Sequence, residues 1–135
     1  PGHHPPAADR GQLERLLADL GGGTLDAVLR QCRIASDKRL RTLRAALSRG
    51  DRDAAAREAH TLGGLQRSIG LPSLGEAFAA LERRLEAGEE PEAAFLEDLA
   101  STLAGAHEAA RKLLAAGDGG LHDRQRTHGH GGESR

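Results

Sequence analysis

Residues 43–62 read LRAALSRGDRDAAAREAHTL, which contains the end of one helix, a short turn and most of a second helix. Leu43 and Leu47 continue an apolar stripe with the spacing of one buried helix face. Gly50 interrupts this pattern, and the next residue, Asp51, is of a type that caps helix N-termini. Because so short a turn joins two long helices, this stretch predicts an antiparallel helix pair.

Glycine and proline clusters divide the rest of the chain at residues 21–23, 70–72 and 88–91. The expected helices cover 13–20, 24–48 and 51–69, followed by one capped by Ser73 and one opened by Pro91. The apolar positions assigned to their buried faces are Leu13, Leu16, Leu17, Leu20, Leu25, Val28, Cys32, Leu40, Leu43, Leu47, Leu62, Leu65, Ile69, Leu74, Phe78, Leu81, Leu85, Phe95, Leu99, Leu103 and Leu113. The pattern predicts an all-α fold, an antiparallel up-down four-helix bundle with a short extra N-terminal helix.

The composition is that of one helical domain. The chain has 135 residues with two Phe and no Tyr or Trp, so the core is expected to be aliphatic. The Pro- and His-rich segment 1–8 and the polar, Gly-rich segment 117–135 lack the apolar surface needed to offset chain entropy. Both segments are expected to be flexible, which leaves the ordered domain over 9–116.

The charge pattern excludes several classes of partner. The formal net charge is −1 and the two signs are interspersed, so neither nucleic acid nor a membrane surface is an expected partner. No stretch approaches the roughly 18 apolar residues that span a bilayer. One cysteine, Cys32, and no signal peptide favour a cytoplasmic location, and the apolar helix position of Cys32 indicates a buried structural thiol.

His60 is the main candidate for function. At about 100° per residue, Leu62, Leu65 and Ile69 define the core direction of their helix, and His60 points roughly 140 to 180° away from each. His60 is therefore expected to face solvent. The residues expected on or beside the same outward stripe are Ala56, Arg57, Gly63, Gly64 and Arg67.

These neighbours are small or cationic, which suits a phosphoryl group. Gly64 and Ala56 leave room for a large partner to approach the ring, and Arg57 and Arg67 supply positive charge for an anion on it. Near neutral pH a solvated histidine has an unshared nitrogen pair that can attack phosphorus, and the phosphoramidate formed can pass the group onward.

The residues around His60 resemble the motif of the histidine phosphotransfer (HPt) domains of bacterial phosphorelays. That motif has an Ala-His pair, an apolar residue two positions after the His, Lys and Gly at three and four, and Gly at ten. The matching residues are Ala59, His60, Leu62, Gly64 and Gly70. The segments 43–62 and 73–82 (SLGEAFAALE) are also similar to the family, and the resemblance covers about residues 13–114.

The resemblance implies a phosphoryl carrier without kinase activity of its own. His60 would attack the phosphoaspartate of a receiver domain through Nε2 and later load a second receiver. The implied partners are receiver domains of response regulators and of a hybrid kinase. Mg²⁺ is expected on the receiver only, the carrier itself needs no cofactor, and it is expected to be a monomer without membrane contact. The expected parent is a hybrid sensor kinase with this domain at its C-terminus, with a free-standing carrier as the alternative.

The chain departs from the motif at one position, where Gly63 replaces the usual Lys. In the family that Lys helps to balance phosphoryl charge, and Arg67 is expected to take over part of this role. The departure also favours a different class of function, a helical docking or dimerisation module that acts without phosphorylation.

The other histidines are assigned no function. His107 is interpreted as a partly buried or boundary residue of the last helix. The remaining ones, His3, His4, His122, His128 and His130, lie in the two end segments. A metal site needs three or four ligands in fixed geometry, so no metal site is predicted.

Overall fold

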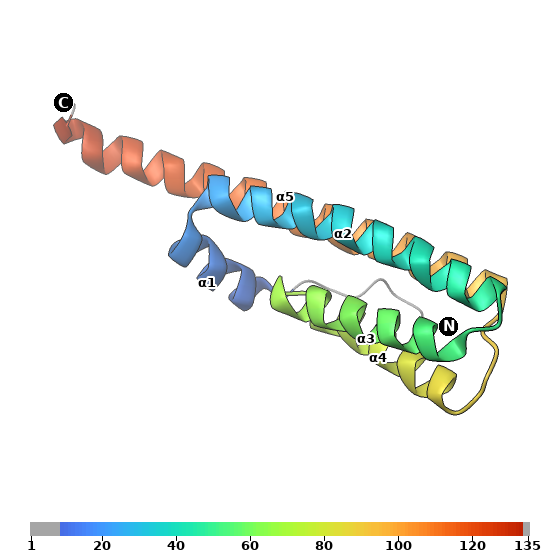
Figure 1. Cartoon of the computed structure of the whole chain (residues 1–135). Coiled ribbons are helices and arrows are strands. Elements are labelled where there is room, and N and C mark those ends of the chain that lie inside the picture. Colours follow the sequence, from blue (N-terminus) through green and yellow to red (C-terminus); the bar gives the residue numbers. More distant parts are fainter. Residues whose placement is uncertain (1–8, 134–135) are drawn as a thin grey trace.

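The computed structural model describes residues 9–133, with side chains described as far as Ala116. Within that range the chain forms five helices and no strand, so the predicted all-α class is confirmed. The helices are α1 (Arg10–Leu20), α2 (Gly22–Ser48), α3 (Arg52–Ser68), α4 (Pro72–Glu86) and α5 (Ala93–Glu133) (Figure 1).

The helix ends follow local capping chemistry. Asp51 is the N-cap of α3, as predicted, and its Oδ1 accepts a 3.0 Å hydrogen bond from the amide of Ala54. The prediction that Ser73 caps the next helix is wrong, because α4 already begins at Pro72 with Leu71 before it. Proline fits this position because the first turn of a helix leaves its amides unpaired in any case. Pro91 likewise does not open α5, which begins at Ala93.

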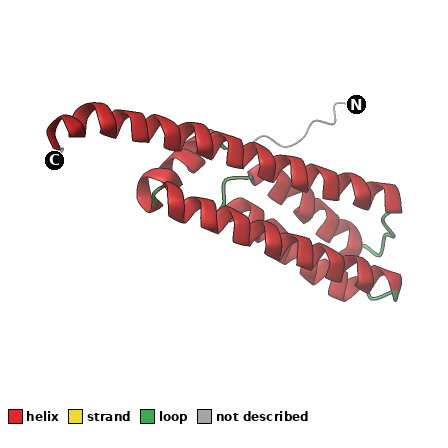
Figure 2. Ribbon diagram, turned by 90° about the horizontal axis from the view of Figure 1, so that it is seen from above, coloured by secondary structure: helices red, strands yellow, loops and turns green. Residues whose placement is uncertain are grey.

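Helices α2 to α5 run alongside one another (Figure 1, Figure 2). The turn between α2 and α3 and the loop between α4 and α5 lie at one end of the molecule, and the turn between α3 and α4 lies at the other (Figure 1). α3 packs against α4 and α2, and α5 packs against α1, α2 and α4. The positions of the turns make α3 and α4 antiparallel, which brings residues far apart in sequence to the same level.

Two glycines allow α3 and α4 to approach closely. A Cβ placed on Gly75 of α4 would lie 3.0 Å from the carbonyl oxygen of Gly63 in α3 and 2.6 Å from Cγ of Arg67. Both distances are shorter than ordinary contacts, so a side chain at position 75 would push the helices apart.

The core is aliphatic, as predicted, with one buried aromatic side chain, that of Phe78. Two predicted core positions are wrong, because Val28 is 38% exposed and Leu20 is 43% exposed. Leu29 takes the position expected for Val28, since the buried face of α2 passes between α3 and α5 and includes Leu25 and Leu29, one turn apart. Leu20 is the last residue of α1, the helix that packs against α2 and α5. The predicted core residues that are only partly buried are Leu16, Leu47, Leu65, Phe95 and Leu113.

Helix α5 is longer than predicted. The composition predicts disorder from Gly117, whereas the α5 backbone continues as a helix to Glu133 and projects past the start of α2 (Figure 1). Extending a helix that has already formed avoids the cost of nucleation. Residues 1–8 and the side chains of 117–135 lie outside the described residues, so the predicted domain limits stay predictions. In the described part of the chain, no helix is both long and apolar enough to cross a bilayer.

Candidate functional site

His60 lies in the middle of α3, and its side chain is 76% exposed, which confirms the predicted solvent-facing position. One of the two ring nitrogens has a partner in the protein. Nδ1 lies 3.2 Å from Oε1 of Glu82, a residue of the neighbouring helix α4 whose side chain is largely buried. The contact therefore joins an exposed ring to the carboxylate of a largely buried side chain.

This contact selects the tautomer of the ring. A carboxylate can only accept a hydrogen bond, so Nδ1 carries the proton and the unshared pair resides on Nε2. Because the rest of the ring faces solvent, Nε2 of His60 is the nitrogen open to a reagent from outside. The geometry thus provides an oriented nucleophile at the surface.

A shallow depression lies beside His60 between α3 and α4. Its lining residues are Asp53, Ala56, Arg57, His60, Thr61, Glu82 and Glu86. Three of them are carboxylates and one is a guanidinium, so the depression is more acidic than the outward stripe of α3 alone suggests. Arg57 is the cation that lies in the depression with the ring.

The small residues near His60 divide into two groups. Gly64 is exposed, and a Cβ added there would meet nothing within 4 Å, so this side of the ring is open. Gly63 is buried against α4, and Ala56 is only 7% exposed. The prediction that Ala56 lies on the exposed stripe is wrong, and Gly63, which was expected beside that stripe, is covered by α4, because α2 and α4 both pack on α3.

Arg67 lies on the exposed side of α3 but turns towards α4. Its Nη2 donates a 3.3 Å hydrogen bond to the carbonyl oxygen of Gly75 and lies 3.7 Å from Oε1 of Glu76. Its Nη1 lies 3.4 Å from the point that a Cβ of Gly63 would occupy. The guanidinium therefore lies over Gly63, in space that a side chain at that position would fill, and it is about half exposed.

Glu82 is the functional residue that the sequence does not identify, because it reads there as one of several charges on a solvated face. The signal that could identify Glu82 is the register of an antiparallel helix pair. Two helices joined at residues 69–71 bring position 82 opposite position 60. Reading that signal requires knowing that α3 and α4 are packed partners.

A second histidine is buried in the core. His107 of α5 is 2% exposed, so its interpretation as a boundary residue is wrong. Its Nε2 lies 2.7 Å from Oε1 of Gln66 in α3, and Nε2 of Gln66 donates to Oγ of Ser36 in α2 at 2.9 Å. Burial, with a smaller contribution from Arg33, lowers the pKa of His107 to about 4. Cys32 is buried beside this network, and burial raises the pKa of its thiol, as suits the predicted structural role.

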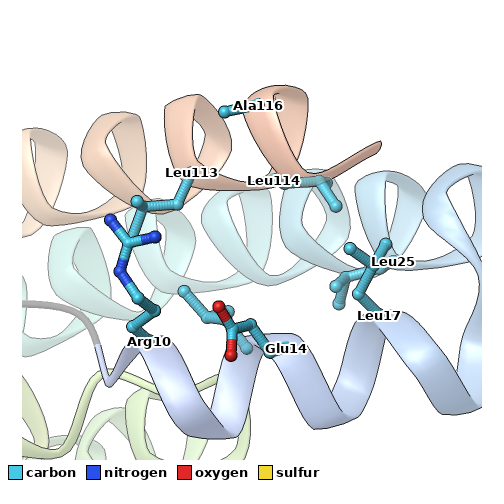
Figure 3. A pocket seen from close by; sticks show the side chains of 8 residues that line it. Arg10, Glu14, Leu17, Leu25, Leu113, Leu114 and Ala116 are labelled. Carbon is cyan, nitrogen blue, oxygen red and sulfur yellow. The ribbon is translucent and has the colours of Figure 1, made fainter. Parts of the chain in front are cut away.

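An apolar depression elsewhere holds no candidate nucleophile. It lies between α1, the start of α2 and α5, with Leu17, Leu25 and Leu114 among its walls and Arg10 and Glu14 as its charged residues (Figure 3). Among the described residues, no group of three or more His, Cys, Asp or Glu side chains is placed to hold a metal ion.

Fold and site together define a helical domain that presents an oriented imidazole, that of His60, at its surface. The chain belongs to the Hpt domain family, whose model matches residues 27–116 and so covers α3, α4 and most of α2. No curated protein and no solved structure matches the chain. Hpt domains are phosphoryl carriers of two-component signalling that interact with receiver domains and have no catalytic activity of their own.

Proposed function

We propose that His60 accepts a phosphoryl group from the aspartate of a receiver domain and passes it to the aspartate of a response regulator. The observation that carries this proposal is the 3.2 Å contact of Glu82 with Nδ1, since it directs the unshared pair of the exposed ring to Nε2. We take α2 to α5 as the up-down four-helix bundle of the family, with α1 as its extra N-terminal helix.

In the forward step the unshared pair on Nε2 attacks phosphorus, the N–P bond forms, and the bond from phosphorus to the aspartyl oxygen breaks. The electron pair of the broken bond leaves with the receiver's carboxylate. The proton on Nδ1 of His60 stays in place, and the Glu82 carboxylate stabilises the positive charge that develops on the ring. In the reverse step the carboxylate of a second receiver attacks the same phosphorus, and the pair returns to Nε2.

The phosphoryl charge is balanced from both partners. Mg²⁺ is supplied by the receiver, so the carrier needs no cofactor. On the carrier, Arg57 lies in the depression beside the ring, and Arg67 lies about two turns further along the exposed side of α3. Gly64 leaves space for the receiver's loops. Gly63 and Ala56 are buried and contribute through helix packing rather than by contact with the partner.

The proposal extends to the setting of the domain. We infer a cytoplasmic carrier that is monomeric in isolation and either forms the C-terminal domain of a hybrid sensor kinase or stands free.

The test needs no known partner. The folded protein is treated with phosphoramidate, and mass spectrometry follows modification at each of the seven histidines over time. We expect rapid, acid-labile modification concentrated at His60 and absent there in His60→Gln. The histidines of segments 1–8 and 117–135 serve as internal references. Modification of His60 no faster than these references would contradict the proposal and favour the docking or dimerisation module.

A further inference from the structure

Arg67 lies in a slot that two glycines leave open between α3 and α4. A Cβ on Gly75 would lie 2.6 Å from Cγ of Arg67 and 3.3 Å from its Nε, and a Cβ on Gly63 would lie 3.4 Å from its Nη1. The aliphatic stem of the arginine therefore crosses the space left by Gly75, and its guanidinium ends over Gly63. Since a side chain at position 75 would displace the stem, the path of this cation depends on the glycine there.

The guanidinium in this slot lies close to His60 along the same helix. Residues three apart on a helix have Cβ atoms about 5–6 Å apart, so a group over Gly63 lies about one turn from the imidazole. Both side chains turn towards α4, where the arginine meets Glu76 and the histidine meets Glu82. Ala79 follows Glu76 by three positions and precedes Glu82 by three, so it lies between them on that side of α4. Small residues on both helices thus leave a path from the cation to the ring.

The contacts that hold Arg67 in the slot are weak and can be released. Its Nη2 donates a 3.3 Å hydrogen bond to the carbonyl oxygen of Gly75, which uses one of the five N–H groups, and lies 3.7 Å from Oε1 of Glu76. Oε2 of Glu76 accepts a closer hydrogen bond, at 2.9 Å, from Nη2 of Arg83. That bond and the charge of Arg83 lower the pKa of Glu76, and Arg67 adds less. Because exposed ion pairs contribute little, and Glu76 keeps Arg83, the guanidinium of Arg67 can leave at low cost.

We propose, on the basis of the phosphotransfer function above, that Arg67 is held in this slot as the cation that binds the phosphoryl group of phosphorylated His60. Gly75 and Glu76 are its positioning residues. On phosphorylation the guanidinium leaves Glu76 and donates hydrogen bonds to phosphoryl oxygens, and it returns when the group passes to a receiver. No covalent bond forms or breaks in this movement. A long side chain at position 63 would compete for the same space, which gives a physical reason for the glycine there.

The test measures the pKa of the phosphoryl group itself. The whole chain is treated with phosphoramidate, and phosphorus NMR follows the phosphohistidine signal as a function of pH, with His60→Gln to assign it. A bound guanidinium stabilises the dianion, so the acid dissociation constant should be about threefold larger in the native chain than in Arg67→Gln, as an exposed ion pair supplies. Arg111→Gln is the matched control. Arg111 is also 48% exposed and 3.7 Å from a carboxylate, but it lies on α5, which packs against α1, α2 and α4.

A second variant tests the slot. Gly75→Ala should lower the constant by about the same factor as Arg67→Gln, because its Cβ displaces the stem of Arg67, and the double variant should show no further loss. A further loss in the double variant would show that Gly75 does not position Arg67. Should Gly75→Ala not fold, the comparison of Arg67→Gln with Arg111→Gln decides.

The outcomes separate this proposal from the proposed function. A phosphorylated His60 with the same constant in the native chain and in Arg67→Gln would overturn the role of Arg67 and leave phosphotransfer standing. A native chain in which His60 is not phosphorylated would overturn both.

Discussion

Acidification from about pH 7 to about pH 4.5 is expected to destabilise the fold through His107. In the unfolded chain this imidazole takes up a proton near its ordinary pKa of 6.5, whereas in the fold its pKa is lowered to about 4. Between these values the unfolded state binds more protons than the native state, so stability falls as the pH falls. Near pH 7 the contribution of the neutral, buried ring is fully present.

The size of the effect follows from the difference between the two pKa values. Each pKa unit corresponds to about 1.4 kcal/mol, so acidification to about pH 4.5 should remove about 2.5 kcal/mol through His107 alone. The assay is urea unfolding followed by far-ultraviolet circular dichroism at both pH values. His107→Gln is the matched control, since its side chain does not titrate and all carboxylates are retained. The free energy of unfolding of the native sequence should fall by about 2.5 kcal/mol more than that of the variant. Equal losses in the two proteins would refute the reasoning.

Three further substitutions test the site and its supporting helices. Glu82→Gln removes the negative charge that stabilises the positive charge developing on the His60 ring during attack, and it should slow modification by phosphoramidate about tenfold. Glu86→Gln in the same depression should not slow it, and equal rates for the two variants would remove Glu82 from the mechanism. Gly75→Ala should lower the free energy of urea unfolding by about 1 to 3 kcal/mol because of the contacts its Cβ would make, and unchanged stability would contradict the close approach of α3 and α4. Gly64→Ala should keep full stability but slow phosphoryl transfer from a receiver. Asp51→Ala should cost about 1 kcal/mol, as read from the thermal midpoint, and an unchanged midpoint would show that the cap contributes nothing.

The helices of this protein were predictable because their signals are local. Apolar spacing and the residues of the turns identify five helical segments, and Asp51 caps α3 through a bond to a residue three positions away. Predictions of burial were wrong where a neighbouring helix determines which side chain is covered. Val28 and Leu29 are both apolar, and only the positions of α3 and α5 show that Leu29 is buried and Val28 exposed. The error at the start of α4 was local instead: Ser73 and Pro72 are both suited to a helix start, and α4 begins at Pro72.

In the candidate site, too, some features depend on a single helix and others depend on how the helices pack. The exposure of His60 and the open space at Gly64 follow from the angular positions of residues on a single helix, so the sequence by itself determined them. Glu82 reaches the ring only because α3 and α4 pack antiparallel, and no local pattern contains that register.

The network of Ser36, Gln66 and His107 depends even more on tertiary structure, since it joins three helices. The sequence determined which helices form and which histidine faces solvent, because these properties depend on spacing along one chain segment. The packing of the helices decided which polar groups meet across the interfaces. It thereby set the proton position on the ring of His60, because a hydrogen bond requires two groups within about 3 Å, and separation in sequence does not determine that distance.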